Sequence, residues 1–152
     1  MATKRWTHLM IHHSDGPPGQ TVDAIRAYHT ARPPRGRGWS DIAYHYLIQR
    51  DDRGKGHLKG GRPTSRNGAH AGTLAWNSKA LGLCIIGRFA PGGEVMLDAL
   101  YADVLAAVLH IMRLHGIPPA NLLAHRDVRA TECPGEWFPM QRLREDVRRA
   151  LG

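Results

Sequence analysis

The stretch Leu81-Gly82-Leu83-Cys84-Ile85-Ile86 decides the fold of this chain, because it is the most apolar of the segments that could form a strand. A short continuous apolar run is typical of a strand that is buried on both faces. We therefore expect residues 81–86 at the centre of a β-sheet. Within that strand, Cys84 is expected to act as a small buried hydrophobic residue.

A second strand is predicted over residues 6–13, where Leu9 and Ile11 would share one face and His12 would lie on the other. A turn rich in glycine and proline follows at once. The adjacent His12 and His13 therefore stand at the carboxyl end of a strand, where α/β proteins commonly place their sites. Either histidine is a candidate metal ligand.

A third strand is predicted over residues 42–48, and its alternation places Tyr44 and Tyr46 on the same face. A short return strand is expected over residues 56–59. Residues 60–72 then form a long loop without apolar periodicity. Loops of that length in a compact domain are often functional.

Three helices complete the α/β pattern. They are predicted over residues 21–30, from residue 96 or 97 to residue 115, and over residues 140–151. The side chains expected to face the core are Val22, Ile25, Tyr28 and His29 on the first helix, and Leu97, Leu100, Tyr101, Val104, Leu105, Val108, Ile111, Met112 and Leu114 on the second.

Length and composition fit one globular domain over residues 1–152, with 42% hydrophobic and 22% charged residues. No apolar run approaches the ~20 residues that span a bilayer, and the first residues lack the apolar segment of a signal peptide. We therefore expect a cytoplasmic chain without stable membrane association. In such a chain Cys84 and Cys133 would not form a disulfide.

The net charge of +8 is uneven, because residues 32–66 hold nine lysines and arginines against three aspartates. Such a segment favours an anionic partner, either a nucleic acid or a carboxylate-rich substrate, although it is also compatible with a merely solvated surface. A nucleic-acid-binding surface would interleave aromatic and basic residues. Aromatic residues make up only 7% of the chain, so we expect no nucleic-acid partner.

The segment His125-Arg126-Asp127-Val128-Arg129-Ala130-Thr131-Glu132-Cys133-Pro134-Gly135 carries the clearest chemistry. An imidazole and a thiolate beside a rigid turn are zinc ligands, and His12 or His13 could supply a third. A His-His-Cys set leaves one tetrahedral position open for water, as in catalytic sites. A phenol such as Tyr44 or a hydroxyl such as Thr131 could stabilise a developing oxyanion by hydrogen bonding.

The sequence resembles the type-2 group of zinc-dependent N-acetylmuramoyl-L-alanine amidases, which includes the peptidoglycan-recognition proteins. The resemblance covers about residues 6–150 and implies a central mixed β-sheet flanked by helices, with zinc at the bottom of a cleft. The blocks that carry it, in the family's order, are residues 11–14, 41–48, 68–71, 76–78, 81–87 and 125–135.

The resemblance also implies individual roles. It selects His12 over His13, because the family's ligand directly follows the apolar residue of the strand. It implies that Zn²⁺ is bound by His12, His125 and Cys133, that Tyr44 and Thr131 are catalytic, and that His70 and Asn77 line the substrate groove.

This sequence differs from two branches of the family at positions near the predicted site. One phage lysozyme of the family carries a lysine two residues before the ligand cysteine, whereas this chain has Thr131, as amidase-active recognition proteins often do. The peptidoglycan-recycling members use an aspartate as third ligand and a glutamate on the central strand, where this chain has Cys133 and Cys84. The resemblance therefore points away from the recycling branch.

The implied reaction is hydrolysis of the amide between the lactyl group of N-acetylmuramic acid and L-alanine in peptidoglycan. The basic segment would meet carboxylates of the stem peptide, with Arg62 or Arg66 as a candidate reader of a diaminopimelate carboxylate. Asp127 and Glu132 are expected to be structural, since no acidic general base is evident near the motif.

The sequence is compatible with two other hypotheses: a binding module that holds peptidoglycan without cutting it, and a basic nucleic-acid-binding domain. The presence of both Cys133 and Tyr44 favours the enzyme. A lone catalytic domain without a wall-binding module resembles a phage or prophage endolysin. We expect a monomer that waits in the host cytoplasm until lysis and then acts on periplasmic peptidoglycan.

Overall fold

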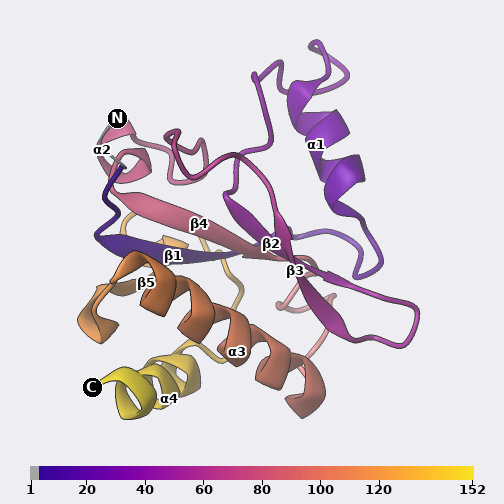
Figure 1. Cartoon of the computed structure of the whole chain (residues 1–152). Coiled ribbons are helices and arrows are strands. Elements are labelled where there is room, and N and C mark those ends of the chain that lie inside the picture. Colours follow the sequence, from indigo (N-terminus) through magenta and orange to yellow (C-terminus); the bar gives the residue numbers. More distant parts are fainter. Residues whose placement is uncertain (1–3) are drawn as a thin grey trace.

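A five-stranded mixed sheet forms the centre of the computed structural model, which describes residues 4–152 (Figure 1). The strand order is β3-β2-β4-β1-β5, and only β3 runs antiparallel to its neighbour. The expected mixed sheet is confirmed, and β4 is the central strand, as its apolar sequence predicts. The strands are β1 (His8–His13), β2 (Tyr46–Arg50), β3 (Gly56–Gly60), β4 (Ala80–Ile85) and β5 (Leu122–Ala124).

Helices cover both faces of this sheet. Figure 1 shows α3 and α4 together on one side and α1 apart from them on the other. The four α-helices are α1 (Val22–Thr30), α2 (Leu74–Asn77), α3 (Asp98–His115) and α4 (Met140–Leu151), with short 3-10 turns at Pro119–Asn121 and His125–Asp127. Within residues 4–152, no helix combines the length and the apolar character that crossing a bilayer requires.

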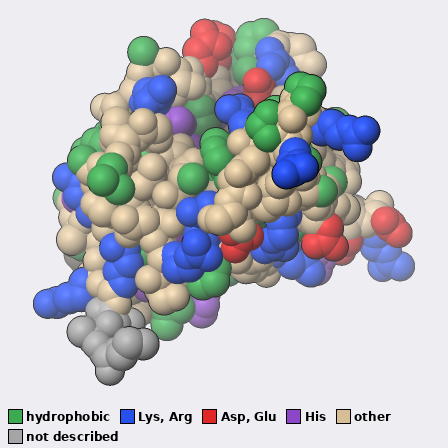
Figure 2. All heavy atoms as spheres, turned by 90° about the horizontal axis from the view of Figure 1, so that it is seen from above, with side chains coloured by type: hydrophobic (Ala, Val, Ile, Leu, Met, Phe, Trp, Pro, Cys, Tyr) green, Lys and Arg blue, Asp and Glu red, His purple; other side chains and the backbone are tan. Residues whose placement is uncertain are grey.

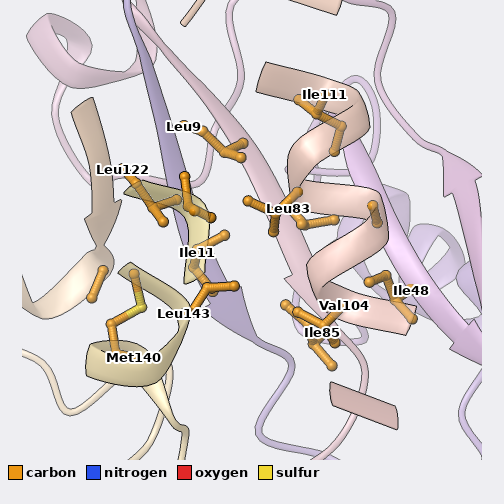
Figure 3. Packing of buried hydrophobic residues seen from close by; sticks show 14 of the residues in the cluster. Leu9, Ile11, Ile48, Leu83, Ile85, Val104, Ile111, Leu122, Met140 and Leu143 are labelled. Atoms are coloured by element: carbon orange, nitrogen blue, oxygen red, sulfur yellow. The ribbon is translucent and has the colours of Figure 1, made fainter. Parts of the chain in front are cut away.

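The larger core lies between the sheet and the pair α3 and α4. Alternate residues of β1 and β4, such as Leu9 and Leu83, point to this side because successive side chains of a strand face opposite ways. They meet Val104 of α3 and Leu143 of α4, all four fully buried (Figure 3). Burial of each such side chain stabilises the fold by roughly 1.5–3 kcal/mol.

The opposite face of the sheet is covered by α1. Thr21 caps this helix by accepting a hydrogen bond from the backbone N–H of Ala24, as expected of an N-terminal threonine. Val22 and Ile25 pack on Leu47 of β2 and on Cys84, which is fully buried and free of any disulfide. This smaller core supports the side of the sheet on which His12 lies.

The third strand is shorter than its sequence predicts, because β2 begins only at Tyr46. The preceding backbone bonds to loops instead: the carbonyl of Tyr44 accepts from Arg62, and that of Ala43 accepts from Ala69. Strict alternation therefore does not apply there, and the prediction that Tyr44 shares a face with Tyr46 is wrong. Tyr44 packs with Leu47, on the same side of the sheet as α1.

Three side chains assigned to the helical core are exposed. Tyr28 of α1 is 51% exposed, while Leu97 and Leu114 are 73% and 63% exposed. Leu97 is the residue that directly precedes α3, at the amino-terminal cap position of the helix. The other two lie at the edge of their apolar stripes, where the helix surface turns away from the sheet.

Candidate metal centre and substrate cleft

Three potential ligands meet at one edge of the sheet. His12 comes from the end of β1, His125 follows β5 directly, and Cys133 lies in the loop after it. Since β1 and β5 are parallel, their carboxyl ends reach the same edge. One ligand atom from each of the three residues lies within 4.8 Å of the others. The structure thus brings together the three residues that the sequence predicts as zinc ligands.

His13 belongs to the other face of the strand. Its Nδ1 accepts a hydrogen bond of 3.2 Å from the backbone N–H of Phe89, and its ring stacks near the ring of that residue. By contrast, Nδ1 of His12 lies 3.6 Å from Sγ of Cys133. The alternation of β1 therefore separates the two adjacent histidines and leaves His12 in the cluster.

Burial controls the protonation of these ligands. It lowers the pKa of His12 well below the ordinary value, with further lowering from His70 and His125, and it also lowers the pKa of His125. Both imidazoles are therefore neutral near pH 7, with a lone pair available. Burial raises the pKa of the Cys133 thiol to about 11, so a bound cation must displace its proton.

The chemistry of the donor set fits zinc. Two neutral imidazole nitrogens and one sulfur, with no carboxylate among them, are borderline-soft ligands of the kind that zinc sites use. Calcium and magnesium, which prefer oxygen ligands, are disfavoured by the same set.

Tyr44 stands beside this cluster. Its ring centroid lies 5.2 Å from that of His12 and 5.9 Å from that of His29. Burial raises the pKa of the phenol well above its ordinary value, with a further contribution from the neighbouring thiols of Cys84 and Cys133. The phenol therefore keeps its proton at neutral pH and is available as a hydrogen-bond donor.

Thr131 holds the loop that carries Cys133. Its Oγ1 accepts a hydrogen bond of 3.2 Å from the backbone N–H of Cys133, which leaves the hydroxyl proton free to be donated elsewhere. Thr131 and Cys133 line one cleft of about 300 Å³, together with His13 and Arg88. The hydroxyl and the predicted ligand thus border the same open space.

His70 and Asn77, predicted to line the substrate groove, make contacts inside the protein. His70 is only 6% exposed, and its Nδ1 lies 2.8 Å from Nε2 of His12. Burial lowers the pKa of His70 to about 3. The side-chain oxygen of Asn77 accepts from the backbone N–H groups of His70 and Ala71. Contact of either side chain with substrate stays a prediction.

The contact between His70 and His12 was not predicted from the sequence, because 58 positions separate the two residues. One sequence signal lies beside it. Gly68 and Gly82 both border the His70 ring, and a Cβ at either position would lie 2.5–2.6 Å from its atoms. A glycine within an otherwise continuous apolar strand marks such a close approach.

The basic residues of the 32–66 segment have different environments. Arg62 is buried, and its guanidinium donates to the carbonyl oxygens of Ile42, Asn67 and Asp41. It is therefore not free to read a substrate carboxylate, whereas Arg66 is exposed. On the face shown in Figure 2, lysine and arginine side chains are scattered among uncharged surface rather than gathered in one stripe.

Asp127 in the motif has a structural role, as expected. Its carboxylate accepts from the backbone N–H of Ala124 and pairs with Arg144 of α4 at 2.5 Å. These contacts anchor the turn after β5 and so fix the starting point of the loop that leads to Cys133.

Comparison with known proteins gives a consistent result. A family model described as N-acetylmuramoyl-L-alanine amidase matches residues 2–136. The endolysin of Enterobacteria phage K11 is 32% identical over 123 residues, which are 80% of this chain and 72% of that protein. Peptidoglycan-recognition protein SC2 of Drosophila melanogaster is 32% identical over 136 residues, which are 85% of this chain and 68% of that protein.

The fold has solved relatives as well. The structure of the N-acetylmuramoyl-L-alanine amidase LysC from Clostridium intestinale URNW superimposes with a TM-score of 0.77 at 28% sequence identity, covering 95% of this chain and 86% of that one. The family match spans most of the sequence, and the predicted ligands meet in the structure. The chain therefore belongs to the type-2 N-acetylmuramoyl-L-alanine amidase family.

Proposed function

We propose that this protein is a zinc-dependent amidase that hydrolyses the bond between N-acetylmuramic acid and L-alanine of peptidoglycan, and that it serves as a phage or prophage endolysin. The observation that carries the proposal is the convergence of His12, His125 and Cys133, of which Cys133 also borders an open cleft. A zinc ion in this site would acidify a water molecule and polarise the scissile carbonyl.

The protein's own side chains supply the rest of the chemistry. The protonated phenol of Tyr44 donates a hydrogen bond to the carbonyl oxygen as negative charge develops on it. The hydroxyl of Thr131 is a second donor, because its proton is not used in the hydrogen bond that its oxygen accepts from the N–H of Cys133. Both donors are neutral, so they stabilise the oxyanion without the full charge that a lysine would bring.

The partner in this proposal is peptidoglycan, whose stem peptides carry carboxylates. Arg88 borders the cleft beside Thr131 and is 43% exposed in its side chain, although it already pairs with Asp15. Binding of peptidoglycan is supported by the recognition proteins and amidases among the relatives. We propose that the protein acts as a monomer, without nucleic acid and without stable attachment to a membrane.

One pair of measurements tests the reaction and the metal together. Bound zinc would be determined by elemental analysis, and release of soluble muropeptides from purified sacculi by chromatography, for the wild type and Cys133→Ala. Both are expected to be lost in the variant. Cys84→Ala is the matched control, since it removes a buried thiol outside the ligand set and should keep its zinc. Full activity in a zinc-free Cys133→Ala protein would refute the mechanism.

The biological setting needs a separate test. Under the proposal, the protein stays in the host cytoplasm until the inner membrane is opened and then reaches the periplasmic wall. Cells that express it should remain intact until a membrane-permeabilising agent is added and should lyse promptly afterwards. Lysis without permeabilisation would contradict this localisation.

A further inference from the structure

The dipeptide His70-Ala71 contacts both histidine ligands. The His70 ring lies 2.8 Å from Nε2 of His12, and the carbonyl oxygen of Ala71 lies 3.2 Å from Nε2 of His125. Both contacts use the Nε2 atom, which leaves Nδ1 of each ligand unengaged by this segment. These contacts determine which nitrogen of each ligand ring carries the proton.

Nε2 of His70 lies 2.9 Å from the carbonyl oxygen of Ala80, which can only accept a hydrogen bond. In a neutral imidazole one nitrogen donates and the other accepts, so Nδ1 of His70 is the acceptor. The proton between the two rings therefore sits on Nε2 of His12, and Nδ1 of His12 is bare.

For His125, one hydrogen bond determines which ring nitrogen carries the proton. The carbonyl of Ala71 is again an obligatory acceptor, so Nε2 of His125 carries the proton and Nδ1 is bare. The bare Nδ1 of His12 lies 3.6 Å from Sγ of Cys133, inside the predicted ligand cluster. Both imidazoles are thus set to offer the same atom, Nδ1, to a metal.

The contacting segment is itself held in place. The side-chain oxygen of Asn77 accepts from the N–H groups of His70 and Ala71 at 3.0 and 2.9 Å. The His70 ring lies against Gly82 of β4, where an added Cβ would approach its atoms to 2.6 Å, and against Gly68, where the approach would be 2.5 Å. The anchored backbone and the close packing together hold the His70 ring in a single orientation.

We propose that His70 and Asn77 are positioning residues that fix the tautomers and ring orientations of both histidine ligands before any metal binds. This inference rests on the metal site of the proposed function. Partners of ligand histidines orient the ring and raise its basicity, and their loss typically lowers metal affinity by about 10–100-fold. His70 would act on zinc binding through His12.

The test compares His70→Phe with a matched control, His45→Phe. His45 is equally buried, accepts from the N–H of Gly82, donates to the carbonyl of Arg66, and packs 5.7 Å from His70 between ring centroids. It makes no hydrogen bond to a ligand. Both changes replace a buried imidazole that makes two hydrogen bonds by an apolar ring. They should therefore lower the free energy of unfolding by similar amounts.

Two readouts report on the ligands and do not depend on amidase activity. Nitrogen-15 NMR of the metal-free wild type distinguishes a protonated ring nitrogen from a bare one, and should show the proton on Nε2 of both His12 and His125. Competition with a chelator should show zinc affinity falling about 10–100-fold in His70→Phe and staying at the wild-type value in His45→Phe. A proton on Nδ1 of His12 in the wild type would overturn the inference, as would equal zinc affinities of the two variants.

Asn77 offers an independent pair of variants. Asn77→Asp keeps an oxygen that can accept both backbone N–H groups, whereas Asn77→Leu removes it. Zinc affinity should survive the first change and fall with the second; equal affinities would remove Asn77 from the proposal. Because the tautomers are measured in metal-free protein, a failure of amidase activity alone would count against the proposed function and leave this inference standing.

Discussion

Sγ of Cys133 lies 3.6 Å from Nδ1 of His12, although 121 positions separate the two residues in the chain. The contact joins the end of β1 to the loop beyond β5, two strands that are paired in parallel. Any change that removes either side chain is therefore expected to abolish metal binding while leaving the sheet itself in place.

Replacing Tyr44 by phenylalanine should separate catalysis from metal binding. The ring packing beside His12 is retained, but the donor to the oxyanion is lost. We expect zinc content to be unchanged and kcat to fall by roughly 10²–10³, the usual effect of removing one such donor. The check is steady-state hydrolysis of a soluble muropeptide alongside elemental analysis. Wild-type turnover in Tyr44→Phe would exclude the phenol from the chemistry.

Thr131 should act through its hydroxyl. Thr131→Val preserves the shape of the side chain but removes both the free donor and the acceptor for the N–H of Cys133. We expect slower muropeptide hydrolysis and a loss of stability of about 1–3 kcal/mol from the unpaired N–H. Thr131→Ser keeps the hydroxyl and serves as control, with activity near that of the wild type. If the valine variant were equally active, the hydroxyl would have no role in the reaction.

Stability should fall as the solution is acidified below pH 6.5. Burial lowers the pKa of His29 and of His45 from 6.5 to about 4, and that of His70 to about 3. The unfolded chain takes up these protons at higher pH than the folded protein, so acid favours unfolding. Between roughly pH 6.5 and 4 each group should remove at most about 1.4 kcal/mol per pH unit from the free energy of unfolding.

Urea denaturation of the metal-free protein at a series of pH values measures this slope. His29→Gln is a useful comparison, because it removes one of the histidines whose pKa is lowered and should make the dependence on pH shallower. A free energy of unfolding that stays constant from pH 7 to pH 5 would show that these rings are not buried in the neutral form.

The central strand should be far more sensitive to truncation than the ends of α3. Leu83 is fully buried between β4 and the helices, whereas Leu97 is 73% exposed. Leu83→Ala should lower the free energy of unfolding by about 2–5 kcal/mol, while Leu97→Ala should change it by less than about 0.5 kcal/mol. Thermal or urea unfolding of the two variants gives the comparison, and similar losses would argue against the described packing of β4.

Much of the fold follows from local pattern. The apolar run that became β4, the alternation of Leu9 and Ile11, and the long apolar stripe of α3 each depend on burial along a regular element. Each of these patterns can be recognised within a short segment of the sequence. The start of β2 is different, because the backbone of Ala43 and Tyr44 is paired by loop residues whose position no local pattern specifies.

The candidate site also contains residues that the sequence predicts and residues that it does not. His12, His125 and Cys133 can be predicted from the sequence because their residue types are unusual at strand ends and beside a turn, and because the sequence blocks resemble a known family. The role of His70 depends on hydrogen bonds to His12 and Ala80, which come from separate strands. Only the assembled fold places these groups together.

Gly82 gives the central strand a built-in trade-off between stability and activity. A glycine within a strand is unfavourable by roughly 0.5–1 kcal/mol relative to alanine, so Gly82→Ala would be an obvious choice for an engineer seeking a more heat-resistant protein. The added methyl group would collide with the His70 ring at 2.6 Å and push it away from His12. Efforts to raise the thermal stability of this protein should therefore leave Gly82 unchanged and substitute residues on exposed surfaces, such as the outer face of α4.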